Sequence, residues 1–261
     1  MDALQVAVLS LILIFFATAL GAGTVFFCHK PLSEKANALV LGFSGGIRMA
    51  ASFFGLLLPS IEQSKERESL SFLPPLLGFL LGCVFLFLLD FFVPHFHKIT
   101  GVEEGKPSPL NNNLKFFLAV TIHNIPEGLS VGFAAGLARK ERGNAPYISS
   151  CLSLAIGIAI QNVPEGAAVS LPLYGDGRKK SKGFLFGTLS GLVEPLFGIL
   201  GLFLARLSSL TPWLLSFSAG ARRYVILDEL LPEARKKGIE HYGLFSFLAG
   251  FRIRMALEIL I

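Results

Sequence analysis

The sequence predicts an all-α membrane protein with eight transmembrane helices, inverted repeats and proline-kinked fourth and fifth helices. Three observations lead there: the composition, a series of long apolar windows, and a polar motif that occurs twice. Of the 261 residues, 52% are hydrophobic and 16% are charged, and the mean hydropathy is +0.63. A soluble domain of this size carries about 25% charged residues. The deficit indicates an integral membrane protein.

The apolar windows each hold about 20 residues, which is the length needed to cross a hydrocarbon core of roughly 30 Å. Because lipid offers no partners to backbone polar groups, each window is expected to be a helix. The first window has the acidic Asp2 and no positive residue before it, so it is predicted to be a permanent span rather than a signal peptide. The predicted spans, which together form a single transmembrane domain over residues 1–261, are 4–27, 37–60, 73–93, 114–138, 146–173, 184–206, 210–232 and 241–261.

The positive charges predict the orientation. Loops joining spans 1–2, 3–4, 5–6 and 7–8 carry twice as many Lys and Arg as the loops on the opposite side. Positive loops stay in the cytoplasm. Both termini are therefore predicted to be extracytoplasmic, with a cytoplasmic loop at about 94–113 and the chain in the plasma (inner) membrane. The three cysteines are scattered and form no metal or disulfide spacing.

The repeated motif is "HNIPEG" at 123–128 and "QNVPEG" at 161–166, near the centres of the fourth and fifth spans. Consecutive spans run in opposite directions, so the two copies are inverted relative to each other. Inverted repeats with interrupted helices near the midplane are typical of a transporter's binding site. Pro126 and Pro164 each remove a helical hydrogen bond, which predicts a kink in both helices.

Within each copy, the helical period places the polar residues on one face. His123 and Glu127 are four residues apart, and Asn124 is three residues from Glu127. The second copy repeats this arrangement with Gln161, Asn162 and Glu165. Gly128 and Gly166, directly after the glutamates, allow a neighbouring backbone to approach closely.

A glutamate at this depth is costly unless a cation or a proton compensates its charge. The sixth span adds a third carboxylate, Glu194, next to Pro195. Carboxylates, an imidazole and amide oxygens suit Zn²⁺ or another divalent first-row ion better than Cu⁺, which prefers sulfur. The other interpretation is a buried polar clamp between helices, which is worth about 1 kcal/mol per hydrogen bond. Glu194 taken alone is also compatible with a structural role.

These two motifs, with "GLVEPLFG" in the sixth span and "LDELLPEA" in the seventh, resemble the ZIP family of zinc and iron transporters, nearest its bacterial ZupT-like and GufA-like branches. The resemblance covers nearly the whole chain. It implies uptake of Zn²⁺ into the cytoplasm by an elevator-like displacement of one helix bundle against another. Fe²⁺, Mn²⁺ and Cd²⁺ are alternative transported substrates.

The resemblance also implies a binuclear metal site in the middle of the membrane. Its first ion would be bound by His123, Glu127, Gln161 and Glu165. Its second would be bound by Asn124, Asn162 and Glu194, with Glu127 and Glu165 bridging both ions.

Other polar residues allow two interpretations. Asp228 and Glu229, toward the inner end of the seventh span, are either exit-side metal contacts or residues at a solvated helix end. Asp90, at the inner end of the third span, is better explained as a solvated helix end than as a cation contact. His95 and His97 in the 3–4 loop do not saturate a zinc ion and form at most a weak site.

Five arginines depart from the family pattern, because the resemblance implies small or apolar residues, methionine among them, at these positions. Each lies near the middle of a span, where an arginine costs about 3 kcal/mol on insertion scales. They are Arg48, Arg222, Arg223, Arg252 and Arg254. They pair with Asp90, Asp228, Glu229 or Glu258, face a water-filled cavity, or are substitutions foreign to the natural chain. If Arg48 points at the metal site, its charge opposes cation binding.

Two other functions are alternatives to transport: an intramembrane metal-dependent hydrolase, and a metal-binding membrane protein without transport. A zinc hydrolase needs an open coordination position and a base, as in His-Glu-x-x-His, and that motif is absent. No Gly-x-x-x-x-Gly-Lys-Ser/Thr loop is present either, which disfavours ATP as an energy source. We expect no enzymatic activity, no organic cofactor and no nucleic-acid partner. The expected partners are divalent metal ions and the lipid bilayer, and a homodimer is left open.

Overall fold

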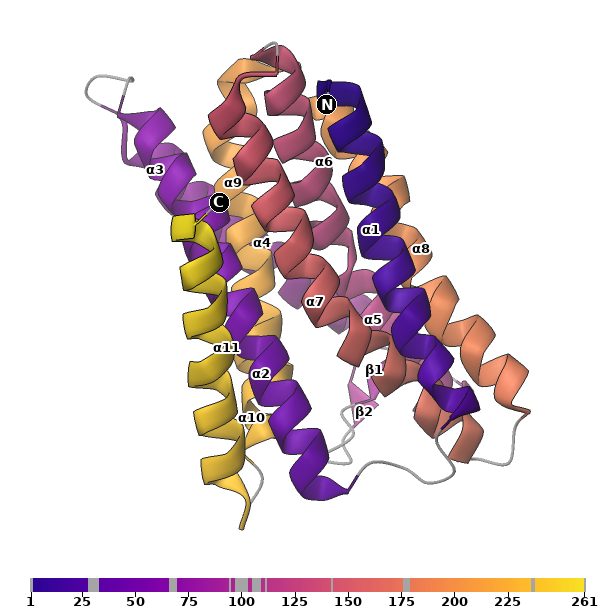
Figure 1. Cartoon of the computed structure of the whole chain (residues 1–261). Coiled ribbons are helices and arrows are strands. Elements are labelled where there is room, and N and C mark those ends of the chain that lie inside the picture. Colours follow the sequence, from indigo (N-terminus) through magenta and orange to yellow (C-terminus); the bar gives the residue numbers. More distant parts are fainter. Residues whose placement is uncertain are drawn as a thin grey trace.

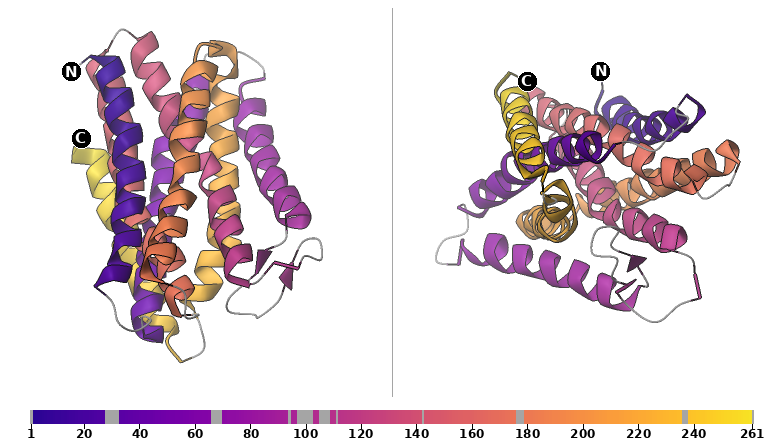
Figure 2. Two further views of the ribbon diagram at one scale, coloured as in Figure 1. Left: turned by 90° about the vertical axis from the view of Figure 1, so that its right-hand side faces the viewer. Right: turned by 90° about the horizontal axis from the view of Figure 1, so that it is seen from below.

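The computed structural model describes residues 2–27, 33–65, 70–93, 95–96, 103–104, 109–110, 112–141, 143–175, 179–235 and 238–260. Within these residues the chain forms eight helical stretches, which confirms an all-α membrane protein (Figure 1). The two termini lie toward the same end of the bundle, as an even number of spans requires (Figures 1 and 2).

The stretches follow the predicted windows closely. They are α1 (Ala3–Gly23) with a 3₁₀ turn (Thr24–Phe26); α2 (Glu34–Ser52) continuing through a π-helical turn (Phe53–Leu57) into α3 (Leu58–Ser64); α4 (Leu73–Phe92); α5 (Asn112–His123) followed by α6 (Ile125–Lys140); α7 (Ala145–Gly175); α8 (Lys180–Leu204); a 3₁₀ turn (Ser208–Leu210) leading into α9 (Thr211–Val225), a π-helical turn (Ile226–Leu230) and α10 (Leu231–Ala234); and α11 (Glu240–Leu260). A two-residue strand pair, β1 (His95–Phe96) with β2 (Glu103–Glu104), lies between α4 and α5.

Five of the stretches are long and apolar enough to cross a membrane by length and composition, and they occupy Ala3–Phe26, Glu34–Ser64, Leu73–Phe92, Ala145–Leu171 and Lys180–Leu204. The fourth stretch is divided at Asn124 into α5 and α6, of 12 and 16 residues, and the last two stretches contain Arg222, Arg223, Arg252 and Arg254.

Local sequence explains several helix starts. The Asp2 carboxylate accepts a hydrogen bond from the backbone N–H of Gln5 at 2.8 Å, and the Gln5 side chain accepts one from the backbone N–H of Asp2 at 3.0 Å. This reciprocal pair is a capping box. Ser33 caps α2 by accepting from the backbone N–H of Ala36. Prolines lie in the first turn of α4, α6 and α9, where a missing N–H has no cost.

The helices pack as a four-helix group and two helix pairs. α1, α6, α7 and α8 form the four-helix group, while α11 packs on α2 and α4 packs on α9 (Figures 1 and 2). Glycines permit this packing: a Cβ added to Gly46 on α2 would overlap the backbone of Phe247 on α11. A Cβ added to Gly82 on α4 would likewise overlap the backbone of Phe217 on α9. Small residues are what allow membrane helices to approach this closely.

The fourth and fifth spans differ in continuity. The fourth is interrupted at Asn124, between α5 and α6, with Pro126 in the first turn of α6. The fifth, α7, is helical from Ala145 to Gly175 and includes Pro164. A kink in α7 and the inverted relation of the two motif copies stay predictions.

Candidate metal centre

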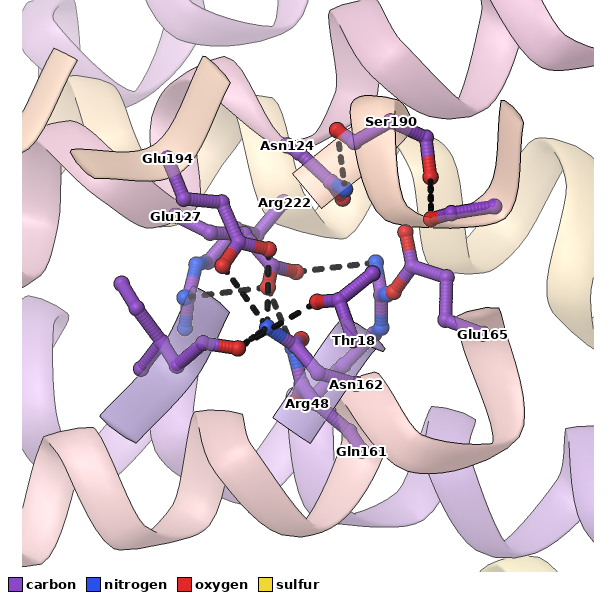
Figure 3. A network of polar contacts seen from close by, with 12 residues as sticks. Thr18, Arg48, Asn124, Glu127, Gln161, Asn162, Glu165, Ser190, Glu194 and Arg222 are labelled. Carbon is purple, nitrogen blue, oxygen red and sulfur yellow. Dashed lines mark hydrogen bonds and ion pairs between the residues drawn. The ribbon is translucent and has the colours of Figure 1, made fainter. Parts of the chain in front are cut away.

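Three glutamates from consecutive spans come together inside the bundle. Glu127 lies in the first turn of α6, Glu165 in the middle of α7 and Glu194 in the middle of α8. Figure 3 shows them in one network of polar contacts that also contains Asn124, Gln161 and Asn162. Glu127 and Glu194 are fully buried, and Glu165 is nearly so. The three carboxylates thus belong to one buried network, and the metal site that the sequence predicted from them remains a prediction.

Side-chain amides hold this arrangement. Gln161 donates from Nε2 to Oε2 of Glu127 at 2.7 Å, which joins α7 to α6. Asn162 donates from Nδ2 to both carboxylate oxygens of Glu194 at 2.8 Å, which joins α7 to α8. Asn124 donates to the backbone carbonyl of Ser190 at 3.2 Å. Buried polar groups are normally paired in this way, because an unpaired one costs about 1–3 kcal/mol.

The glycines of the two motif copies lie at helix contacts. A Cβ added to Gly128 would overlap the backbone of Glu194 on α8. One added to Gly166 would overlap the backbone carbonyl of Thr18 on α1. The predicted role of these glycines in close backbone approach is confirmed.

Arg48 on α2 points directly at the centre. Its Nη1 forms an ion pair with Oε1 of Glu127 at 2.9 Å, and its Nη2 donates a hydrogen bond to Oε2 of Glu165. Arg222 on α9 lies behind it, with Nη2 at 4.0 Å from Oε2 of Glu127. One guanidinium group therefore lies between the two carboxylates that were predicted to bridge metal ions (Figure 3).

Several buried polar atoms at the centre have no hydrogen-bond partner among the described residues. On the acceptor side they include the amide oxygens of Asn124, Gln161 and Asn162. On the donor side they include all three guanidinium nitrogens of Arg222, a side chain that is 2% exposed. Unpaired buried atoms at a site of this kind call for a specific explanation.

His123 is placed at the edge of the centre. Its Nε2 lies 3.3 Å from Oδ1 of Asp90 on α4, and both residues are buried. The expectation that Asp90 occupies a solvated helix end is therefore wrong, because α5 covers it. The sequence offered no signal for this contact, since the two residues are 33 positions apart and belong to no shared motif. Across the described part of the chain, no three His, Cys, Asp or Glu side chains form a group that could hold a metal ion.

A small cavity of about 50 Å³ adjoins the centre, and Arg48, His123 and Glu165 contribute to its wall. Its other walls come from α2, α5, α7 and the segment that follows α9. A cavity of this size has room for water. Phe116 and Val120 of its wall lie on α5, between the centre and the 94–113 loop that is predicted to be cytoplasmic.

The remaining candidates lie elsewhere. Asp228 is exposed in the π-helical turn after α9, and the Glu229 side chain lies outside the described residues. His95 lies in β1, but its side chain is outside what the structure describes. His97 lies outside the described residues altogether.

The other three arginines have separate surroundings. Arg254 is buried and pairs with Glu258 at 2.6 Å, as one of the predicted alternatives had it, and it donates to Ser153 at 3.0 Å. Arg223 is half-buried against the rings of Phe53 and Phe79. Arg252 is exposed.

The fold and the buried centre define the chain as an integral multi-pass membrane protein with a polar site enclosed by its helices. A family described as ZIP zinc transporter matches residues 112–258, which include α5 to α11. The chain is 36% identical to zinc transporter GufA of Myxococcus xanthus, with 93% of each chain aligned. It is 35% identical to zinc transporter ZupT of Chlorobaculum parvum and 31% identical to human zinc transporter ZIP11, again over 93% of each chain. The chain belongs to the ZIP family.

Proposed function

We propose that this protein transports divalent transition-metal ions across a membrane, zinc first among them, through the centre formed by Glu127, Glu165 and Glu194. The observation that carries this proposal is that three buried carboxylates belong to one polar network inside the helical bundle. Carboxylates at such depth mark ion pathways in membrane proteins. The names of the relatives, zinc transporters from bacteria to vertebrates, support zinc as the substrate.

The proposed ligands are those that the family resemblance implies. They are the carboxylates of Glu127, Glu165 and Glu194, the amide oxygens of Asn124, Gln161 and Asn162, and the imidazole of His123. Fe²⁺, Mn²⁺ and Cd²⁺ are further candidates, since their ligand preferences overlap with those of zinc. The two-ion arrangement implied by the resemblance requires Glu127 and Glu165 both to be available as bridges.

The proposed direction is into the cytoplasm, across the inner membrane, with both termini outside. The excess of Lys and Arg in the loops on one side supports this orientation. The cavity beside Arg48 and Glu165 lies on that same side, so it is the proposed route of release.

An intramembrane hydrolase is the second candidate from the sequence, and the comparisons disfavour it because the relatives are named as transporters. A metal-binding membrane protein without transport differs from a transporter only in that it moves no metal across the membrane. The deciding experiment therefore measures zinc uptake into sealed proteoliposomes that contain the purified chain.

The uptake experiment compares the unchanged chain with Glu127→Ala and Glu165→Ala. Saturable uptake by the unchanged chain, abolished by both substitutions, supports the proposal. Glu62→Ala is the matched control, because Glu62 is exposed at the end of α3 and its removal leaves the centre intact. Zinc binding without uptake by the unchanged chain would contradict transport.

A further inference from the structure

We propose that Arg48 is a tethered cation that takes the place of one metal ion, so that the centre of this chain holds a single divalent ion. The inference rests on the proposed function, because it concerns the number of ions at the same site. It makes Arg48 a residue that determines how the centre binds its substrate.

The first argument is geometric. The guanidinium group of Arg48 contacts Glu127 with one terminal nitrogen and Glu165 with the other. These are the two carboxylates that two adjacent metal ions would have to share. Zinc binds a carboxylate oxygen at about 2.0–2.2 Å, which leaves no room for an N–H donor on the same lone pair. A metal ion that bridges Glu127 and Glu165 therefore cannot bind while the guanidinium group of Arg48 lies between them.

The second argument is electrostatic. The centre contains the three carboxylates of Glu127, Glu165 and Glu194 and the two guanidinium groups of Arg48 and Arg222, which pair with Glu127 and Glu165, so its formal charge is minus one. One divalent ion would bring the centre to a single positive charge, whereas two would bring it to three. Uncompensated charge is expensive where the surroundings screen poorly. Arginine cannot relieve the excess, since its guanidinium group stays protonated in proteins.

The third argument concerns the ligands that remain. Glu194 is fully buried, and the ion pairs of Arg48 go to Glu127 and Glu165. The amide oxygens of Asn124, Gln161 and Asn162 are buried acceptors that have no hydrogen-bond partner among the described residues. A cation is the group that would satisfy a carboxylate and several carbonyl oxygens together. The structure therefore assigns the single ion to the Glu194 side, where its binding requires the Asn162 amide, whose Nδ2 donates to both Glu194 oxygens, to turn its oxygen toward the ion.

The test is a metal count on the purified chain in detergent. The protein is equilibrated with saturating ZnCl₂, free metal is removed, and bound zinc is measured by elemental analysis against protein concentration. We expect one zinc per chain for the unchanged protein and two for Arg48→Met, which has similar length and no charge. Intact-mass measurement establishes that arginine occupies position 48 in the protein assayed.

Two further variants separate charge from shape. Arg48→Lys keeps the tethered positive charge and is expected to bind one zinc. Arg252→Met makes the same chemical change as Arg48→Met at an exposed position on α11, and it is expected to leave the count at one. Two ions in the unchanged chain, or one ion in a folded Arg48→Met variant, would overturn the proposal.

If Arg48→Met does not fold, the proposal is tested with Glu194→Gln in a chain that keeps Arg48. The proposal predicts loss of the single zinc in that variant, and retention of a full equivalent would refute it. The metal count is independent of uptake. A chain that binds one zinc but moves none into proteoliposomes retains this inference while losing the proposed function.

Discussion

Asn162 donates to both carboxylate oxygens of Glu194 at 2.8 Å and thereby ties the second motif copy on α7 to the carboxylate of α8. Both side chains are fully buried. Asn162 also donates to the backbone carbonyl of Ile14 on α1 at 3.1 Å. One amide group therefore joins three helices of the four-helix group at the depth of the centre.

Asn162→Ala is expected to destabilise the protein, because it leaves a buried carboxylate without its amide donor. A loss of about 1–3 kcal/mol is typical for an unsatisfied buried group. Thermal unfolding in detergent without added metal would measure it. Ser170→Ala is the control, since within the described part of the chain that hydroxyl donates to the backbone carbonyl of Ala167 on its own helix, α7. Equal midpoints for the two variants would contradict a structural role for the Asn162–Glu194 contact.

Gly128→Ala is expected to disturb the centre through the backbone. The added methyl group would overlap the backbone of Glu194, so α6 and α8 would have to separate. Overpacking of this kind costs about 1–3 kcal/mol. Gly23→Ala is the matched control, because its nearest neighbour would be the Phe184 ring at 4.0 Å. A lower unfolding midpoint and weaker zinc binding should occur in the first variant alone.

Arg222→Met is expected to stabilise the protein. The side chain is buried and, within the part of the chain that the structure describes, its three guanidinium nitrogens have no hydrogen-bond partner, so an apolar side chain of similar length removes unsatisfied donors. Replacing poorly compensated buried charge with apolar groups is often stabilising by about 1–4 kcal/mol. Unfolding midpoints with saturating zinc would show the gain, with Arg252→Met as the exposed counterpart. A clear loss of stability would indicate that Glu127 needs the charge of Arg222.

Zinc itself is expected to stabilise the folded chain. A ligand that binds only the native state contributes about 2.7 kcal/mol at a concentration 100 times its Kd. The unfolding midpoint should therefore rise with zinc concentration and return after chelation. Glu194→Gln should remove this dependence, whereas Glu62→Gln, at an exposed position, should retain it. A zinc-dependent shift that survives Glu194→Gln would place the ion elsewhere.

Much of this protein followed from the sequence because lipid leaves the backbone few options. Windows such as 73–93 and 184–206 had to be helices, and α4 and α8 match them within a few residues. A functional role for Glu194 was predicted for a related reason, since a glutamate is too costly in the middle of a membrane without a purpose, and the structure buries this side chain fully. The interruption of the fourth span was signalled by Pro126.

What the sequence alone could not decide is which groups meet across the bundle. Periodicity relates neighbours within one helix, but it does not relate Arg48 on α2 to Glu127 on α6 and Glu165 on α7. The pairing of His123 with Asp90 was likewise set by the packing of α5 against α4. The sequence determined that carboxylates and arginines would both lie near the middles of spans, and only tertiary packing decided which of them are buried and that Arg48 faces Glu127 and Glu165. The physical reason is that burial depends on local hydropathy, whereas charge pairing depends on distances between helices.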